Sequence, residues 1–265
     1  MTTDRDGRAT ILVDLDPAGV LTITLNRPEA LNSFNQQMCD EFEELWREVR
    51  EDDAVRSVVL RAAGDRAFCT GVDVKEGLRA YDNVWSRPSV WSQLSPKANA
   101  VWKPVVCAVH GMAAGGALYW LNDCDVLIAS DDATFFDPHV DGGLVAADEP
   151  IGMILRAPLG EVLRMALMGL DERVSAKRAY ELGWVSEVVG REELWARADD
   201  IAQRLAAKPP TAIQGTVRAI WESLDAPRTT ALVRGASYPR LAAGAGSARR
   251  ELEERPVERR TPRIR

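Results

Sequence analysis

The chain has few of the residues that a metal site or a nucleic-acid site would need. It holds only two histidines and four cysteines in 265 residues. No two cysteines form a CxxC pair, so a cysteine–histidine zinc cluster at finger spacing is excluded. Single scattered cysteines are typical of a reducing compartment. Its 33 Lys and Arg against 40 Asp and Glu give a net charge of −7, whereas nucleic-acid binding needs a basic surface. We therefore expect neither a metal nor a nucleic-acid partner.

Long hydrophobic runs are also missing. The most apolar segment, residues 105–121, contains His110 and three glycines and is shorter than the roughly 20 residues that a membrane-spanning helix needs. The first ten residues carry two Asp and two Arg without an apolar stretch, unlike a signal peptide. The hydrophobic share of 46% and the charged share of 28% are ordinary for a globular protein. We expect a cytoplasmic protein without membrane association.

Strands and helices alternate early in the chain. Apolar and β-branched runs predict strands at 11–15, 20–25, 57–62, 105–109, 126–129 and 134–136. Apolar residues at helical spacing predict a helix over 35–50. Later segments are mainly helical, at about 150–155, 161–168, 176–182, 192–207 and 212–224. This order predicts an α/β core over residues 1–195 and a helical C-terminal region over 196–265.

Two glycine-containing turns follow predicted strands, at residues 68–75 (FCTGVDVK) and 110–116 (HGMAAGG). Neither matches a P-loop or a GxGxxG motif, so phosphate binding by a known nucleotide motif is unsupported. Each turn alone could be an ordinary tight turn. Together they could bring two backbone N–H groups to one oxygen, which is the geometry of an oxyanion hole.

The order and spacing of four motifs resemble the crotonase (enoyl-CoA hydratase/isomerase) superfamily. They are residues 26–32 (NRPEALN), 67–76 (AFCTGVDVKE), 103–116 and Cys124-Asp125, within a similarity that runs from about residue 11 to 207. The resemblance implies a spiral of stacked ββα turns and a helical C-terminal region used in trimerisation. It further implies a homotrimer or a dimer of trimers. The implied substrate is an acyl-CoA thioester, so coenzyme A is part of the substrate and no separate cofactor is expected.

The resemblance also assigns binding roles. The backbone N–H groups of Val72 and Gly116 would hold the thioester oxygen. Proton removal beside a thioester creates an enolate, and two oriented donors stabilise that oxyanion. The family holds the adenine and pantetheine parts of CoA at positions that correspond here to Ala30, Cys69, Thr70, Asp73, Val74 and Lys75. The acyl pocket is expected from residues 81–94, which include Trp85 and Trp91.

The catalytic pair departs from the family pattern. Hydratase members hold water between two glutamates, whose positions correspond here to Tyr119 and His139. A histidine has an ordinary pKa near 6.5, which suits proton transfer at neutral pH. Tyr119 would act as a hydrogen-bond donor or as a wall of the acyl pocket.

The partner of His139 decides between functions. Asp148 lies nine residues further on, the spacing of the histidine–aspartate pair in β-diketone hydrolases related to oxocamphor hydrolase; it could equally be a helix N-cap before Pro150. Asp141 is a weaker candidate. The leading hypothesis is an enoyl-CoA hydratase/isomerase-like enzyme that uses His139. The alternatives are carbon–carbon hydrolysis by His139 and Asp148, or a catalytically silent acyl-CoA-binding protein.

Overall fold

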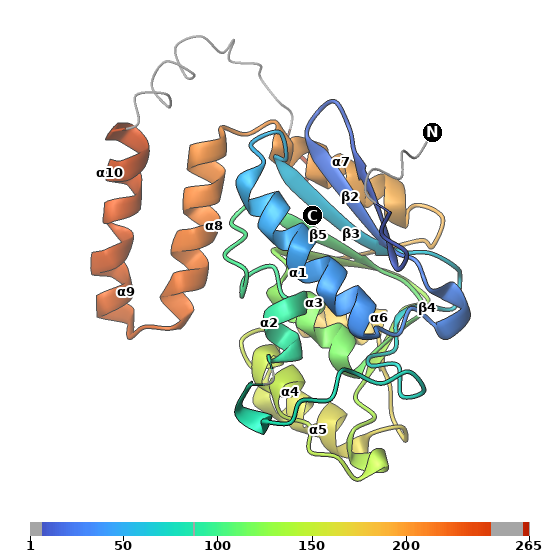
Figure 1. Ribbon diagram of the computed structural model, residues 1–265. Helices are drawn as coiled ribbons and strands as arrows, with labels where there is room; N and C mark the ends of the chain where they lie inside the picture. The colour runs from blue at the N-terminus through green and yellow to red at the C-terminus, as the bar shows by residue number, and fades with distance from the viewer. Residues whose placement is uncertain (1–6, 87, 245–261, 265) are drawn as a thin grey trace. The chain divides into compact units, whose positions relative to one another are not determined.

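The computed structural model describes residues 7–86, 88–244 and 262–264 (Figure 1). The chain divides into two compact units, Met1–Ala207 and Lys208–Arg265. The expected division was at residue 195. Residues 245–261, part of the expected helical region, lie outside the described residues. No described helix is both long enough and apolar enough to cross a membrane.

The larger sheet of the first unit has six strands in the order β1-β2-β3-β5-β7-β10. They are β1 (Ile11–Leu15), β2 (Val20–Leu25), β3 (Ser57–Ala62), β5 (Val105–Val109), β7 (Val126–Ser130) and β10 (Glu187–Val189). β1 pairs antiparallel with β2, and the remaining pairs are parallel. The first five were predicted from apolar runs. β10 was missed because it is only three residues long and half-buried.

A second sheet of four short strands has the order β4-β6-β8-β9. These are β4 (Ala67–Cys69), β6 (Met112–Ala114), β8 (Thr134–Phe136) and β9 (Val174–Ser175). Thus β3, β5 and β7 of the larger sheet are each followed by a strand of the smaller one, in which β4, β6 and β8 are parallel to one another, and the chain repeats a strand–strand–helix turn. The structure is the expected α/β crotonase-type fold.

The second glycine turn differs from its expectation because it contains β6. After β5 the chain turns at Gly111, whose φ is +58° and where a Cβ would collide with the Arg66 carbonyl. Only glycine fits such a position. The chain then forms β6 and enters a 3₁₀ turn, η3 (Gly115–Ala117), followed by α3 (Leu118–Asp123).

Helices cover both faces of the larger sheet. On one face lies α1 (Gln36–Glu51), whose N-cap Asn35 accepts a 3.0 Å hydrogen bond from the Met38 N–H and whose apolar stripe is buried as predicted. On the other face α7 (Leu194–Ala206) packs its alanines against outward residues of the strands, such as Val59 and Ile128. Because α7 belongs to this core, the first unit extends past residue 195 to Ala207.

The remaining elements of the first unit are short. They are η1 (Pro28–Ala30), η2 (Val84–Ser86), α2 (Val90–Leu94), η4 (Val140–Gly142), α4 (Asp148–Met153), α5 (Leu159–Met168) and α6 (Ala176–Glu181). The second unit contains α8 (Pro210–Leu224), α9 (Arg228–Gly235) and α10 (Ser237–Gly244). Each of these three helices contacts the other two.

Candidate active site

The loop after β4 presents the backbone of Val72. Val72 forms a parallel bridge with Phe34, in which the Phe34 N–H donates to the Gly71 carbonyl at 2.9 Å and the Asp73 N–H donates to the Phe34 carbonyl at 2.8 Å. These two hydrogen bonds use the carbonyl of Gly71 and the N–H of Asp73, the residues on either side of Val72. The N–H of Val72 itself therefore points away from Phe34.

The second expected backbone donor is Gly116, in the first turn of η3. The first N–H groups of a helix have no acceptor inside it. A Cβ on Gly71 would lie 3.2 Å from the Gly116 nitrogen, so the two loops approach closely. A Cβ on Gly116 would lie 2.6 Å from Phe34 ring atoms and 3.2 Å from the Tyr119 ring. The site therefore requires glycine at position 116.

Both loops open into a cavity of about 640 Å³. Val72, Gly116, Tyr119, His139 and Glu149 line one part of it. Phe34, Leu78, Tyr81 and Val90 supply apolar and aromatic walls. The structure thus brings together both expected oxyanion donors and the two residues that were expected at the family's glutamate positions.

His139 stands directly beside the oxyanion turn. A Cβ on Gly115 would lie 3.6 Å from its ring carbon Cε1. Its Nδ1 contacts the Asp137 carboxylate, and its Nε2 lies 3.8 Å from Glu149 Oε1. The hydrogen bond to Asp137 raises the pKa of His139 above its ordinary value; burial opposes this, and the charges of Asp137 and Glu149 add to it.

Asp137 is fully buried, and its Oδ2 has no hydrogen-bond partner among the described residues. A buried carboxylate without compensation is costly, so a positive charge on the adjacent imidazole stabilises it. Hydrogen bonding of Nδ1 to this carboxylate leaves Nε2 as the ring nitrogen that faces Glu149.

Glu149, rather than Asp148, is the carboxylate of α4 that faces the cavity. Glu149 is 4% exposed, whereas Asp148 is exposed to solvent. The expected pairing of His139 with Asp148 is therefore not what the structure contains. Asp148 is not the N-cap either, because Ala147 occupies that position and Asp148 is the first helical residue.

Tyr119 lies on α3 and is 9% exposed. Burial, followed by the charge and hydrogen bond of Glu149, raises the pKa of Tyr119 far above its ordinary value. The phenol thus stays protonated, with its hydroxyl beside the Glu149 carboxylate. Asp141 lies elsewhere: its Oδ2 accepts a 2.7 Å hydrogen bond from the Leu170 N–H, which ties η4 to the loop after α5.

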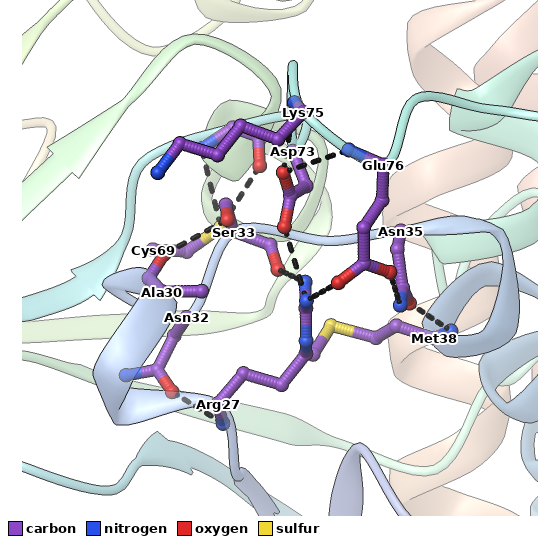
Figure 2. Close-up of polar contacts among 11 residues, drawn as sticks. Arg27, Ala30, Asn32, Ser33, Asn35, Met38, Cys69, Asp73, Lys75 and Glu76 are labelled. Atoms are coloured by element: carbon purple, nitrogen blue, oxygen red, sulfur yellow. Dashed lines mark hydrogen bonds and ion pairs between the residues drawn. The ribbon is translucent and has the colours of Figure 1, made fainter.

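The loop expected to hold CoA is stabilised by a buried arginine (Figure 2). Arg27 pairs with Asp73 at 3.0 Å, contacts Glu76 and donates to the Ser33 carbonyl at 2.7 Å. Asp73 also accepts the N–H groups of Lys75 and Glu76 at 3.0 and 3.2 Å. Burial acts to raise the pKa of Asp73, but these hydrogen bonds and Arg27 hold it below its ordinary value. The Asp73 side chain therefore shapes the loop.

The other expected CoA-binding residues differ in exposure. Cys69 is fully buried and its thiol sulfur accepts the Gly71 N–H at 3.4 Å, so only its backbone can face a ligand. Val74 is 86% exposed and Lys75 is exposed, whereas Ala30 and Thr70 are half-buried.

The two tryptophans expected in the acyl pocket do not line the cavity. Trp85 is 92% exposed, and the Trp91 Nε1–H donates to Asp123 at 2.6 Å. From the same segment, Tyr81 and Val90 reach the cavity instead. Within the described ranges, no group of His, Cys, Asp or Glu is arranged to hold a metal ion.

The family model described as enoyl-CoA hydratase/isomerase matches residues 16–238. This chain belongs to the enoyl-CoA hydratase/isomerase family. It is therefore an acyl-CoA enzyme of the hydratase/isomerase type, and the crotonase resemblance of its motifs is confirmed.

Individual members of the family are moderately similar. The chain is 33% identical to (E)-benzylidenesuccinyl-CoA hydratase of Thauera aromatica, covering 93% of this chain and 95% of that protein. It is 34% identical to 1,2-epoxyphenylacetyl-CoA isomerase of Escherichia coli K12, covering 72% and 74%. The crystal structure of an enoyl-CoA hydratase/isomerase from Mycobacterium paratuberculosis superimposes with a TM-score of 0.85 at 38% identity, covering 94% of this chain and 97% of that one.

Sequence reasoning missed Asp137 and Glu149. Asp137 immediately precedes the Pro138-His139 pair, and its proximity to the histidine is a detectable signal. Glu149 could have been found from helical spacing: it lies four residues before the buried Met153, and residues i and i+4 share a helix face. The nine-residue spacing to Asp148 pointed to the wrong neighbour.

Proposed function

We propose that this protein catalyses hydration or isomerisation of an acyl-CoA thioester through an enolate, with His139 as the proton-transfer group in place of the usual glutamate. The observation that carries the proposal is that His139, Val72 and Gly116 line one cavity of about 640 Å³. This observation supports the proposal because a titratable side chain and the two candidate donor residues border a single substrate-sized space.

The chemistry depends on charge developing at the thioester oxygen. The N–H groups of Val72 and Gly116 donate to that oxygen as the enolate forms, and each contributes about 3–4 kcal/mol to the transition state. His139 Nε2 then takes a proton from, or gives one to, the carbon beside the thioester. Asp137 is a positioning residue, since its contact with Nδ1 orients the ring and supports the imidazolium form.

We place the CoA portion of the substrate along Ala30 and residues 69–75. Support comes from the family relationship, from Val74, which is exposed and lines the cavity, and from the exposure of the neighbouring Lys75. Coenzyme A enters as part of the substrate. We also propose a homotrimer or a dimer of trimers, and the exposed apolar residues Leu232, Val233 and Leu241 of the second unit are consistent with a subunit interface.

We further propose that the acyl group carries an aromatic ring. Two similar family members are named for benzylidenesuccinyl-CoA and epoxyphenylacetyl-CoA. Phe34, Tyr81 and Tyr119 line the cavity here and offer ring faces and edges to such a group. Cinnamoyl-CoA, with crotonyl-CoA as the aliphatic comparison, is therefore the first substrate to test.

His139→Gln is the decisive variant. We expect its turnover of the better substrate to fall by about 10²–10⁴, the usual contribution of a general acid–base group. The control is His110→Asn, which changes the other histidine, a residue outside the cavity whose pKa is lowered to about 4 by burial. Product formation is followed by mass spectrometry.

Three outcomes would count against the proposal. Unchanged turnover in His139→Gln would remove His139 from catalysis. Cleavage of a cyclic β-diketone without CoA would favour the hydrolase alternative. Thermal stabilisation by acyl-CoA without turnover of either substrate by the wild type would favour a binding protein.

A further inference from the structure

We infer that Glu149 of α4 is a second catalytic group, which holds and deprotonates the attacking water opposite His139, and that the reaction is therefore hydration. The inference rests on the proposed function. In the family's hydratases, a glutamate at the position of Tyr119 on α3 would help to hold the water. Here we assign that task to Glu149 on α4.

The first observation is the spacing of the two groups. Glu149 Oε1 and His139 Nε2 lie 3.8 Å apart, too far for a direct hydrogen bond. A water molecule about 2.8 Å from each atom spans this separation readily. Both side chains line the cavity that contains the Gly116 turn. A water held there faces the same space as the thioester.

The second observation is that α3 fixes Glu149 in place. The Tyr119 hydroxyl lies beside the Glu149 carboxylate, which together with burial raises the pKa of the phenol. From the next turn of α3, the Asn122 side-chain amide donates to the Glu149 backbone carbonyl at 2.8 Å. A Cβ on Gly152 of α4 would lie 2.8 Å from that same amide nitrogen, so the two helices are in close contact. Glu149 is consequently positioned from both its backbone and its side chain.

The third observation is burial. The Glu149 side chain is 6% exposed and the His139 side chain is 22% exposed. The charged groups around them are Asp137 beside His139 and, on the solvent side of α4, Asp148. A buried carboxylate whose backbone is held by Asn122 and which faces the His139 ring is ordered enough to orient a water molecule.

These groups account for every proton in a hydration. Glu149 takes a proton from the water as its oxygen bonds to the β-carbon of the enoyl thioester. The π electrons of the double bond move toward the thioester, whose oxygen becomes an enolate held by the Val72 and Gly116 N–H groups. As the enolate collapses, His139 gives its Nε2 proton to the α-carbon. The proton on Glu149 then returns to His139, which restores the starting state.

Two measurements on each variant separate the roles. The first is hydration of cinnamoyl-CoA and crotonyl-CoA. The second is exchange of the α-protons of the saturated esters, 3-phenylpropionyl-CoA and butyryl-CoA, with deuterium from D₂O. Exchange requires the oxyanion donors and His139 but no attacking water.

In Glu149→Gln we expect hydration to fall by about 10²–10⁴ while exchange stays within about threefold of the wild type. Tyr119→Phe, which removes only the hydroxyl beside Glu149, should lower hydration by a smaller factor. Asp148→Asn removes the adjacent exposed carboxylate of the same helix and should change hydration by at most about threefold. Melting temperatures confirm that each variant is folded.

The outcomes are distinguishable. Hydration retained in Glu149→Gln, exchange lost together with hydration in that variant, or an equal loss in Asp148→Asn would each overturn the role of Glu149. Exchange retained in His139→Gln, or absent from the wild type, would instead overturn the proposed function.

Discussion

Replacing Gly116 with alanine tests the oxyanion site through one added carbon atom. That Cβ would lie 2.6 Å from Phe34 Cε1 and Cζ, about 1 Å closer than the ordinary contact distance between carbon atoms. Phe34 is 2% exposed, and its ring centroid lies 6.0 Å from Trp120 and 6.4 Å from Tyr119. Because the ring is held by these neighbours, we expect the η3 backbone to shift instead.

The shift determines the size of the effect. A displacement near 1 Å at a reacting geometry costs about 10²-fold in rate. Complete loss of one oxyanion donor costs about 10²–10³-fold, or about 3–4 kcal/mol. We therefore expect kcat of Gly116→Ala to fall by about 10²–10³. Gly160→Ala is the matched control, since nothing lies within 4 Å of its added Cβ in α5.

The assay is steady-state turnover of cinnamoyl-CoA or crotonyl-CoA, with melting temperatures of all variants. Phe34→Leu in the Gly116→Ala background removes the colliding ring atoms and should recover part of the lost rate relative to Phe34→Leu alone. If Gly116→Ala keeps kcat within about threefold of the wild type, the Gly116 N–H is not an oxyanion donor. If the rate falls but the double variant shows no recovery, the collision with Phe34 is not the cause.

Two further predictions concern buried carboxylates. Asp137→Asn removes the main cause of the raised His139 pKa. The alkaline limb of the kcat/KM profile, where His139 loses its proton, should therefore move to lower pH, with at least a tenfold loss of rate. An alkaline limb at an unchanged pH would contradict this role of Asp137. Arg27→Met should cost about 3 kcal/mol of unfolding free energy at neutral pH because it leaves the buried Asp73 carboxylate with its two backbone N–H donors but without its cation. The pKa of Asp73 is lower in the folded than in the unfolded state. The stabilisation by Arg27 is therefore fully present at a pH above the ordinary pKa of an aspartate, and it is lost as the pH falls through the lowered pKa of the folded state. Urea unfolding measured at neutral and acidic pH should therefore show a difference between wild type and variant that shrinks in acid, and a constant difference would refute the assignment.

Most of the strand–helix order was predictable because it depends on local patterns. The apolar stripe of α1 and its Asn35 cap follow from helical periodicity and from the preference of asparagine for the N-cap. The short strand β10 was not predictable, since three half-buried residues carry too little pattern. The extent of the first unit was also set by packing: α7 belongs to it because its alanines meet Val59 and Ile128 across the sheet.

By itself the sequence determined the family, the α/β fold and the two glycine loops, and it singled out His139 as a candidate catalytic residue. These depend on residue identity and spacing along the chain. Only the tertiary structure decided which carboxylates meet His139. Adjacent residues of a helix differ by about 100° in direction, so α4 turns Glu149 into the cavity and Asp148 toward solvent. The chemistry of the site depends on that rotation and on the contact of α3 with α4, which no spacing along the chain specifies.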